Sequence, residues 1–363
     1  MTALLSNLFK PFQNAGDDRG PRVVGVDIGS TSMKVVEVEE REGVLTLATY
    51  GEIQLGPYAE VPLGKQVTLD PKQEQSALID LMRESGVRAK NAVFTVPLTS
   101  SFVTVIGVPL SGKNDDISSR VRVEARKYIP IPINDVTLDW AEVARPAKNK
   151  NQDKQEVLLA AIQNEVLSRL RDLMKQTNFS RQPTEIECFS AIRSLSSASE
   201  KGVAIIDIGG GSSKVYLTQN GLLEQLHRVR VGGSMATEKI AEELSCEFAE
   251  AETKKRELDL ATDEGQVISK VHNSTFERAL REFRKVIDEN EKKYGDQIEK
   301  IVITGGVSSC AGFNSFAEKI LNRKLTVAEP FSKIAYPAFM EDLVKEIGPS
   351  FSVALGAAMR MYQ

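Results

Sequence analysis

The sequence predicts an α/β protein made of two duplicated halves, and three observations lead to this prediction. The pattern D-I-G-x-x-S-x-K-V follows a run of β-forming residues twice, at Asp27–Val35 and at Asp207–Val215. The two copies lie 180 residues apart in a chain of 363 residues, so each copy opens one half. Short β-rich runs alternate with longer segments of helical periodicity in both halves. Two long, similar halves favour a duplication over a solenoid of short repeats.

Composition excludes several classes of protein. With 41% hydrophobic and 26% charged residues, the chain can form packed cores and is not a disordered polymer. A net charge of −4 leaves no excess of positive charge for sequence-independent binding to nucleic acid. The three cysteines are widely spaced and only two histidines accompany them, which fits neither a disulfide framework nor a zinc site. Without a long apolar run or a secretion signal, we expect a cytoplasmic protein.

The first half opens with strands joined by tight turns. Alternating β-formers predict strands at 23–29, 33–38 and 44–50, then a helix at 72–85 and a buried strand at 92–96. The preceding residues 1–20 place Leu4, Leu5, Leu8, Phe9 and Phe12 on one helical face. This segment is either a frayed tail or a weak amphipathic docking segment.

Residues 99–182 have a rhythm of their own and predict a small α+β insert. A strand at 102–108 leads into a helix at 115–128, which Pro130 and Pro132 end because proline lacks a backbone N–H. Two further strands follow at 136–143 and 156–162, joined by a polar, exposed hairpin loop at 148–155, and a helix at 165–176 closes the insert.

The second half repeats the opening of the first. A buried strand at 203–208 precedes helices at 234–258 and 274–293, and Phe276, Leu280, Phe283 and Ile287 form an apolar stripe on the second helix. A strand at 301–304 enters Gly305-Gly306, and an Ala- and Gly-rich helix at 352–361 ends the chain.

The repeated turn has the chemistry of a phosphate site. Glycine lets a backbone approach a ligand closely, and successive N–H groups in such a turn form an anion-binding concavity. Hydroxyl groups add further donors, and Lys34 can reach back to a phosphate. Two facing turns would grip a polyphosphate, with Asp27 and Asp207 facing a Mg²⁺ ion through its waters. The alternative is two unrelated hairpins in which these aspartates only stabilise turns. A P-loop and a dinucleotide-binding motif do not match the sequence.

These motifs resemble the actin-like ATPase superfamily, which includes actin, Hsp70, sugar kinases and the cell-division protein FtsA. Its five local signatures occur in order, and the resemblance covers residues 22–362. The signatures phosphate-1, connect-1, phosphate-2, adenosine and connect-2 resemble residues 27–34, 185–192, 207–214, 301–306 and 352–358.

Within the superfamily the chain most resembles the PilM family of type IV pilus assembly proteins. The insert is similar to the SHS2 module of FtsA and PilM, and Glu124–Pro132 followed by Asp139-Trp140 is similar to PilM in particular. The chain ends directly after connect-2, without the basic amphipathic helix that ends FtsA. The resemblance implies two ribonuclease-H-like halves with an SHS2-like insert. It divides the chain into a tail (1–21), a first domain (22–98 and 183–202), the insert (99–182) and a second domain (203–363).

The resemblance also implies roles for individual residues. Glu252 and Lys255 would meet the ribose, unless they are an ordinary helix-surface pair. Glu187 would position the attacking water, unless it is a helix carboxylate without a catalytic task. The phosphate contacts would be Gly29, Ser30, Thr31, Ser32, Lys34, Gly209, Gly210, Gly211 and Ser212, and the backbone would approach the nucleotide at Gly232, Gly233, Gly305 and Gly306.

The function implied is an ATP·Mg²⁺-dependent scaffold with slow hydrolysis. It would dock the cytoplasmic tail of a PilN-like inner-membrane protein and other platform proteins, so its own membrane contact is indirect. A groove between the first domain and the insert, near Tyr128–Pro132, would receive the tail. In the alternative, Tyr128, Ile129, Ile131 and Trp140 form the core of the insert. An FtsA-like filament former and a small-molecule kinase remain as other functions, although no acceptor-site loop with a general base is evident.

Overall fold

The structure is a computed structural model that describes residues 22–109, 117–143, 154–177, 179 and 184–362. The N-terminal segment and most of the predicted polar hairpin loop lie outside the described residues. Among the helices that the structure describes, none combines the length and apolar character needed to cross a membrane.

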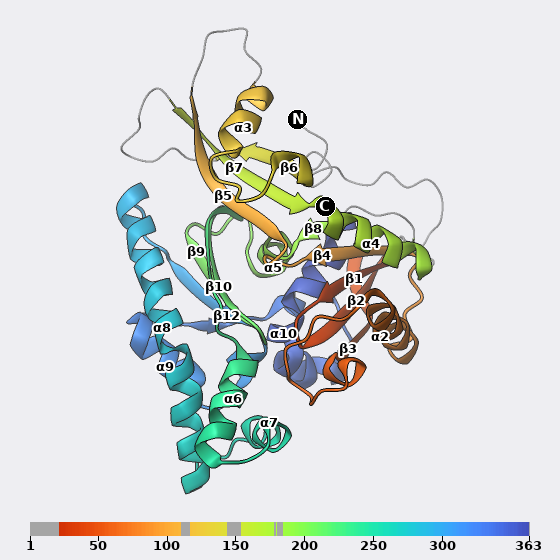
Figure 1. The fold of residues 1–363 in the computed structure, drawn as a ribbon, viewed down its shortest axis with the longest axis vertical. Coiled ribbons are helices and arrows are strands. Elements are labelled where there is room, and N and C mark those ends of the chain that lie inside the picture. Colours follow the sequence, from red (N-terminus) through yellow and green to blue (C-terminus); the bar gives the residue numbers. More distant parts are fainter. Residues whose placement is uncertain (1–21, 110–116, 144–153, 178, 180–183, 363) are drawn as a thin grey trace.

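Two five-stranded sheets have the same strand order, which is the structural form of the duplication. The first sheet runs β3-β2-β1-β4-β8 (Figure 1), and the second runs β11-β10-β9-β12-β13. In each sheet an antiparallel meander is followed by strands parallel to its central strand. The first sheet comprises β1 (Val23–Ile28), β2 (Ser32–Arg41), β3 (Val44–Gln54), β4 (Asn91–Val96) and β8 (Glu185–Ile186). The second comprises β9 (Val203–Ile208), β10 (Ser213–Gln219), β11 (Leu222–Val229), β12 (Lys300–Thr304) and β13 (Thr326–Val327).

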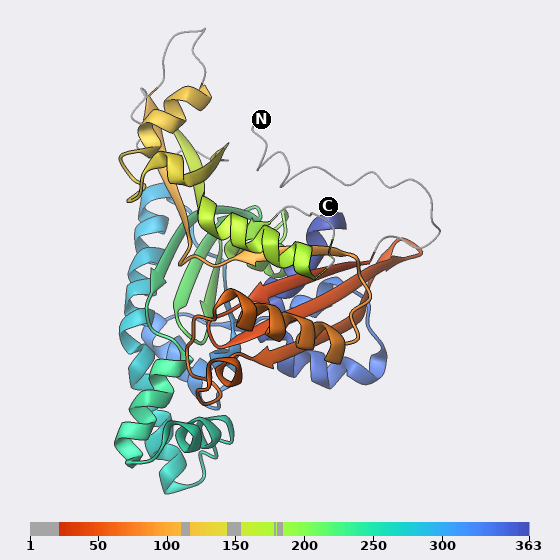
Figure 2. The ribbon, with the colours of Figure 1, turned by 45° about the vertical axis from the view of Figure 1, so that its right-hand side comes forward.

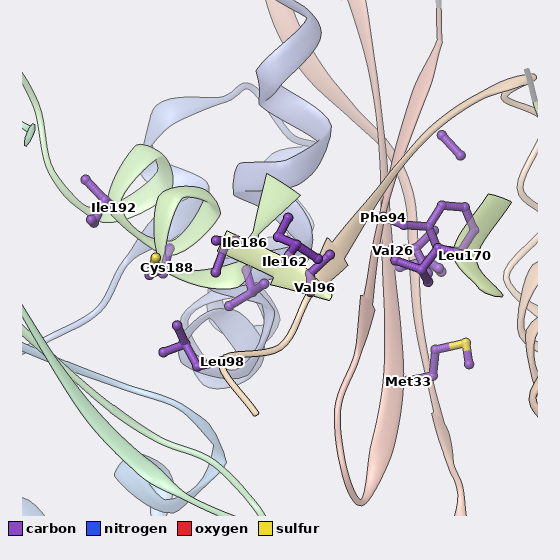
Figure 3. Close-up of a cluster of buried hydrophobic side chains, with 14 of the residues drawn as sticks. Val26, Met33, Phe94, Val96, Leu98, Ile162, Leu170, Ile186, Cys188 and Ile192 are labelled. Atoms are coloured by element: carbon purple, nitrogen blue, oxygen red, sulfur yellow. The ribbon is translucent and has the colours of Figure 1, made fainter. Parts of the chain in front are cut away.

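Helices cover both faces of the first sheet, as Figure 2 shows. Helices α2 (Pro71–Glu84) and α4 (Asn164–Gln176) lie on one face, and α10 (Glu341–Met359) lies on the other. Because side chains alternate along a strand, Val35 of β2 packs on the α2 side and Val36 packs on the α10 side. Figure 3 shows part of the larger core, where Leu170 of α4 lies beside Val26 and Phe94 of the sheet.

The second sheet packs on α8 (Asp263–Tyr294) and α9 (Phe313–Leu321). The predicted apolar stripe of α8 is confirmed, because all four of its residues are buried in this core. The single helix predicted at 234–258 is wrong. It is two helices, α6 (Gly233–Leu244) and α7 (Phe248–Arg256), because Ser245 takes a left-handed conformation with φ of 50° that ends α6. The last helix also begins earlier than predicted, at Glu341, and contains Pro349.

The insert is a three-stranded sheet between two helices. Its strands β5 (Ser101–Pro109), β6 (Val136–Glu142) and β7 (Lys154–Gln163) pair in the order β5-β7-β6. One face shares the core of the first sheet, and the other packs on α3 (Ile117–Ala125). The remaining elements are α5 (Glu187–Leu195) and short 3₁₀ helices: η1 (Gly56–Ala59), η2 (Ile133–Asp135), η3 (Gly306–Ser309), η4 (Pro330–Lys333), η5 (Ala338–Met340) and η6 (Arg360–Tyr362).

Candidate functional site

The two copies of the repeated pattern form the same hairpin turn. Gly29 N donates a hydrogen bond to Ser32 O at 3.0 Å, and Gly209 N donates one to Ser212 O at the same distance. We call residues 27–34 the first turn and residues 207–214 the second turn. In both, the aspartate that ends the first strand lies opposite the lysine of the next strand.

The two turns face and touch each other, one from each sheet. A Cβ atom added at Gly210 would collide with the side chain of Thr31, and one added at Gly211 would lie 2.5 Å from Ser30 Oγ. The side chains of the first turn therefore occupy the space that the glycines of the second turn leave free. Glycine is required at these two positions by the close approach of the opposite turn rather than by a positive φ.

The two lysines of the pattern have different partners. Lys34 Nζ lies 2.6 Å from Ser32 Oγ and 3.0 Å from the Glu52 carboxylate. Lys214 Nζ lies 2.8 Å from Glu187 Oε2 and 3.1 Å from Asp207 Oδ2, in a fully buried cluster. Burial alone would lower the pKa of Lys214, but the Asp207 and Glu187 carboxylates raise it well above its ordinary value. Lys214 is therefore a fixed positive charge beneath the turns.

Glu187 has both of its carboxylate oxygens engaged. Its Oε1 accepts a hydrogen bond from Leu98 N at 2.7 Å, and its Oε2 accepts from Lys214. The first of these bonds places Glu187 at the start of α5 against the end of β4, and the second ties it to the second sheet. Glu187 thus joins the two halves below the turns.

Asp27 is the carboxylate of this cluster without an ion pair among the described residues. Its Oδ1 accepts a hydrogen bond from Thr95 Oγ1 at 3.2 Å. Burial, followed by the negative charge of Glu187, raises the pKa of Asp27 from 3.8 to about 6. A carboxylate in this state gains most from a cation that enters the site.

The glycine pair Gly232-Gly233 lies directly behind the second turn. Gly233 N donates to Gly209 O at 3.0 Å, and Ser234 N donates to Gly210 O at 2.9 Å. Since α6 begins at Gly233, these bonds attach the second turn to the N-terminus of a helix. The partial positive charge of that helix end favours an anion nearby.

Glu252 and Lys255 pair with each other and with α6. Lys255 Nζ lies 2.6 Å from Glu252 Oε2 and 3.2 Å from Gly233 O, while Thr237 Oγ1 also donates to Glu252 at 2.6 Å. Burial alone would raise the pKa of Glu252, but Lys255 and the hydrogen bonds around it lower this pKa overall. The pair is buried rather than a solvated surface pair, and it is next to the glycines behind the second turn.

Gly305 and Gly306 lie beneath and beside the second turn. Gly305 has φ of 87°, and a Cβ atom there would meet Ile208 O and lie 2.9 Å from Asp207 Oδ1. This position therefore needs glycine for both conformation and space. Gly306 is different, because no atom lies within 4 Å of a Cβ added to it.

The fold brings three further groups to the carboxylates of the site. Lys214 and the N–H of Leu98 contact Glu187, and the hydroxyl of Thr95 contacts Asp27. The signal for Lys214 was present, since it aligns with Lys34 in the repeat. Thr95 lies within β4 and Leu98 follows that strand, and neither belongs to a motif, so only the fold brings these two groups to the carboxylates.

The residues of the turns fit a magnesium-bound polyphosphate. The turns combine glycines and hydroxyl groups, and burial, followed by the negative charge of Glu187, raises the pKa of Asp27 and disfavours its ionised form. Asp207 fits less directly as a metal contact, because Lys214 already lies 3.1 Å from it. Among the described residues no group of three or more histidine, cysteine or acidic side chains forms an all-protein metal site. Mg²⁺ commonly uses one or two carboxylates, waters and phosphates instead.

The predicted groove near Tyr128–Pro132 is only partly available. Ile129 is buried in the core of the insert, and Ile131 and Trp140 pack against that core. These contacts favour the alternative, in which these three residues belong to the core of the insert. Tyr128 is the exception, because 44% of its surface is exposed. Strand β6 pairs with β7 on one side and is an edge of the insert sheet.

Two solved structures share this fold. A chain of the PilM–PilN type IV pilus biogenesis complex has a TM-score of 0.77 and 21% identity, covering 94% of this chain and 98% of that one. The ethanolamine utilization protein EutJ from Carboxydothermus hydrogenoformans has a TM-score of 0.52 and 15% identity, covering 96% and 91%. The fold is therefore the actin-like ATPase fold.

Two cell-division proteins illustrate the sequence relationships. FtsA of Bacillus subtilis (strain 168) is 24% identical over 349 residues, covering 85% of this chain and 78% of that protein. FtsA of Rhizobium meliloti (strain 1021) is 30% identical over 181 residues, covering 43% and 40%. The family model described as type IV pilus assembly protein PilM matches residues 25–362. Because that match spans almost the entire chain, the chain belongs to the PilM family of type IV pilus assembly proteins.

Proposed function

We propose that this chain is an ATP-binding, actin-like scaffold of type IV pilus assembly. The observation that carries the proposal is the contact between the two turns, which brings glycines and hydroxyl groups from both sheets to one point. Opposed turns of this kind can hold a polyphosphate from two sides. Nucleotide bound there would connect the two halves of the molecule and stabilise one arrangement of them.

The proposal assigns a role to each group of residues. The phosphates would contact the first turn at Gly29, Ser30, Thr31, Ser32 and Lys34, and the second turn at Gly209, Gly210, Gly211 and Ser212. Glu252 and Lys255 would meet the ribose, and the backbone at Gly232, Gly233, Gly305 and Gly306 would approach the nucleotide. Asp27 and Asp207 would face the Mg²⁺ ion, which balances phosphate charge and orients the phosphates when it is bound.

Hydrolysis is slow, or depends on a partner, in this proposal. Glu187 is the residue proposed to position the attacking water, a task that other hydrogen bonds to its carboxylate oxygens would hinder. Both of its oxygens are engaged, by Leu98 N and by Lys214. An activating partner would have to release one of them. Rapid release of phosphate by the purified chain, lost in Glu187→Gln, would contradict this assignment.

Titration calorimetry with ATP and Mg²⁺ tests the proposed site. We expect the native chain to bind, and Asp27→Ala and Asp207→Ala to bind more weakly, since each removes a carboxylate that faces the metal. Lys90→Glu is a control for a change of surface charge in the first half, because Lys90 is exposed and belongs to none of the ion pairs among the described residues. Unchanged affinity in both aspartate variants would rule out the proposed role of these carboxylates.

We also propose that the partner is the cytoplasmic tail of a PilN-like inner-membrane protein. Membership of the PilM family and the likeness to a chain of the PilM–PilN complex support this partner. Binding to such a tail would hold the chain at the inner face of the membrane, so its membrane contact would be indirect. The exposed Tyr128 and the edge strand β6 are the features of the insert suited to an extended peptide.

A pulldown with a PilN-like tail tests the partner site. We expect Tyr128→Ala to reduce capture of the tail while leaving the melting temperature nearly unchanged, because Tyr128 is exposed. Ile129→Ala is the structural comparison, since Ile129 is buried and its truncation should lower the melting temperature. Full capture by Tyr128→Ala would place the groove elsewhere on the molecule.

The division into domains is part of the same proposal. It assigns 1–21 to a tail, 22–98 and 183–202 to the first domain, 99–182 to an SHS2-like insert, and 203–363 to the second domain. In the structure, α10 from the last of these segments packs against β1 and β2 of the first sheet. The C-terminal helix would therefore hold the two domains together.

A filament-forming role like that of FtsA is the second candidate, favoured by the match to the Bacillus protein over 349 residues. Sedimentation with ATP distinguishes the two. A scaffold stays in the supernatant, whereas a filament former pellets when nucleotide is present.

A further inference from the structure

The segment between β3 and α2 crosses from the first sheet to the second half of the molecule. We call residues 61–67 the clasp. In Figures 1 and 2 this orange segment lies against the green helix α6, although more than 160 residues separate them in sequence. None of the motifs of the sequence includes the clasp.

Backbone hydrogen bonds fix both ends of this segment to the first turn. Leu55 N donates to Thr31 O at 2.9 Å, and Val67 N donates to Ser30 O at 2.8 Å. The segment therefore leaves the first turn and returns to it. Any movement of the first turn must move the clasp as well.

The middle of the clasp contacts α6 and α7 of the second half. Lys65 Nζ lies 2.8 Å from the Glu238 carboxylate and 4.9 Å from the centre of the Phe248 ring. Gln66 N donates to Ser234 Oγ at 3.2 Å. Ser234 follows the glycine pair behind the second turn, so the clasp connects the surroundings of both turns.

Gly64 and the side chain of Gln66 lie against the proposed nucleotide contacts. Gly64 has φ of 80°, and a Cβ atom there would lie 2.5–2.8 Å from the Glu252 carboxylate. Only glycine combines that conformation with that proximity. The carboxamide of Gln66 is exposed and next to the second turn, because a Cβ atom at Gly211 would lie 3.0 Å from it.

The cross-half contacts are individually weak. The side chains of Lys65 and Glu238 are 39% and 45% exposed, so water screens their attraction. The Gln66–Ser234 bond is a single hydrogen bond between neutral groups. Contacts of this strength can open and close reversibly while the bonds to the first turn hold.

We propose that the clasp closes over nucleotide bound between the turns and slows its release, with the Gln66 carboxamide contacting the phosphates. This proposal rests on the proposed nucleotide site. The Lys65–Glu238 pair fastens the clasp to α6, and opening that pair gives the nucleotide its exit. Lys65 and Glu238 act on release through the position of the clasp, whereas Gln66 touches the ligand.

Stopped-flow measurement of the dissociation of a fluorescent ATP analogue with Mg²⁺ tests the clasp. Lys65→Glu places two carboxylates together, and we expect dissociation about 3- to 10-fold faster than in the native chain. The exchanged pair Lys65→Glu with Glu238→Lys should restore the native rate. Gln66→Ala should also accelerate dissociation without changing the melting temperature.

Lys90→Glu makes the same charge change in the same half at an exposed site, and it should keep the native rate. A second readout is hydrogen exchange of the amides of residues 61–67, which ATP·Mg²⁺ should slow in the native chain. Native dissociation rates in both Lys65→Glu and Gln66→Ala would overturn the clasp alone. A native chain that does not bind the analogue would overturn the nucleotide site and the clasp together.

Discussion

The first and second turns share a sequence pattern, a strand register and the same closing hydrogen bond, yet their charged groups are arranged differently. In the second turn, Lys214 forms an ion pair with Asp207 of the same turn. In the first turn, Lys34 forms an ion pair with Glu52 of the neighbouring strand β3, and Asp27 has no ion pair among the described residues. Of the two duplicated aspartates, Asp207 is therefore neutralised by a lysine, whereas Asp27 can still pair with a cation that enters the site.

The cross-strand neighbour explains this difference. Lys34 lies opposite Glu52 of β3, and the opposite charge attracts its ammonium group away from Asp27. Lys214 lies opposite Arg228 of β11, where like charges repel. Its ammonium group pairs instead with Asp207 and with Glu187. The residue opposite each lysine, Glu52 on β3 or Arg228 on β11, therefore determines which carboxylate the lysine pairs with.

The turns differ in side-chain bulk as well. Ser30 and Thr31 of the first turn align with Gly210 and Gly211 of the second turn. Two identical turns with side chains at both positions would collide, whereas here each side chain of one turn faces a glycine of the other. The departure from exact repetition is what allows the turns to meet.

The largest effect is expected on the free energy of unfolding when the lysines of the two turns are replaced. Lys214→Met leaves Asp207 and Glu187 as unpaired buried carboxylates, and we expect a loss of about 3–5 kcal/mol in the free energy of unfolding. Lys34→Met removes a partly exposed pair and should cost at most about 1 kcal/mol. Urea denaturation of the two variants measures both values. Equal losses would show that the two lysines do not differ as described.

The next effect concerns the glycines of the second turn. Gly210→Val forces Thr31 aside, and overpacking of this kind costs about 1–3 kcal/mol. We expect ATP·Mg²⁺ to bind about tenfold more weakly, as calorimetry would measure. Adding Thr31→Gly removes the colliding atoms and should recover part of the stability lost, so the two changes should not be additive. Strictly additive losses would mean that the turns do not touch.

A third effect separates the two aspartates. Because the pKa of Asp27 is raised to about 6, its ionised form destabilises the ligand-free fold. Asp27→Asn should therefore raise the melting temperature by about 2–4 °C at neutral pH. Asp207→Asn should lower it, since Lys214 loses a partner.

The raised pKa of Asp27 also sets how the stabilising effect of Asp27→Asn depends on pH. The folded chain holds the proton of Asp27 more tightly than the unfolded chain does, so the penalty is complete above about pH 6 and disappears as the pH falls toward 3.8. The gain in melting temperature from Asp27→Asn should therefore shrink between pH 6 and pH 4, in melting curves recorded from pH 7 to pH 4. An advantage that is constant with pH would assign it to packing instead.

The smallest effect tests the cross-strand explanation itself. Glu52→Gln removes the charge that holds Lys34, at a cost of at most about 0.5 kcal/mol because the pair is partly exposed. Lys34 is then free to turn toward Asp27 and should lower the pKa of Asp27. A carbonyl-¹³C NMR titration of Asp27 would detect the shift. An unchanged pKa would mean that Glu52 does not decide where Lys34 lies.

The sequence by itself determined the duplication, the order of most strands and helices, and the position of the two matching hairpin turns. It could do so because the pattern D-I-G-x-x-S-x-K-V and the strand and helix periodicities are local and repeat in register. It also determined the buried stripe of α8, since 3.6-residue periodicity needs no tertiary partner to be recognised.

The tertiary structure decided where the charges of the site lie. The partner of each lysine depends on the residue opposite it on the adjacent strand, and the engagement of Glu187 depends on the N–H of Leu98, 89 residues away. The clasp depends on contacts across more than 160 residues. The break between α6 and α7 rests on the left-handed conformation of a serine, which carries no sequence signal as strong as glycine. Ion pairs and close approaches between distant segments are set by packing, and local sequence patterns do not encode them.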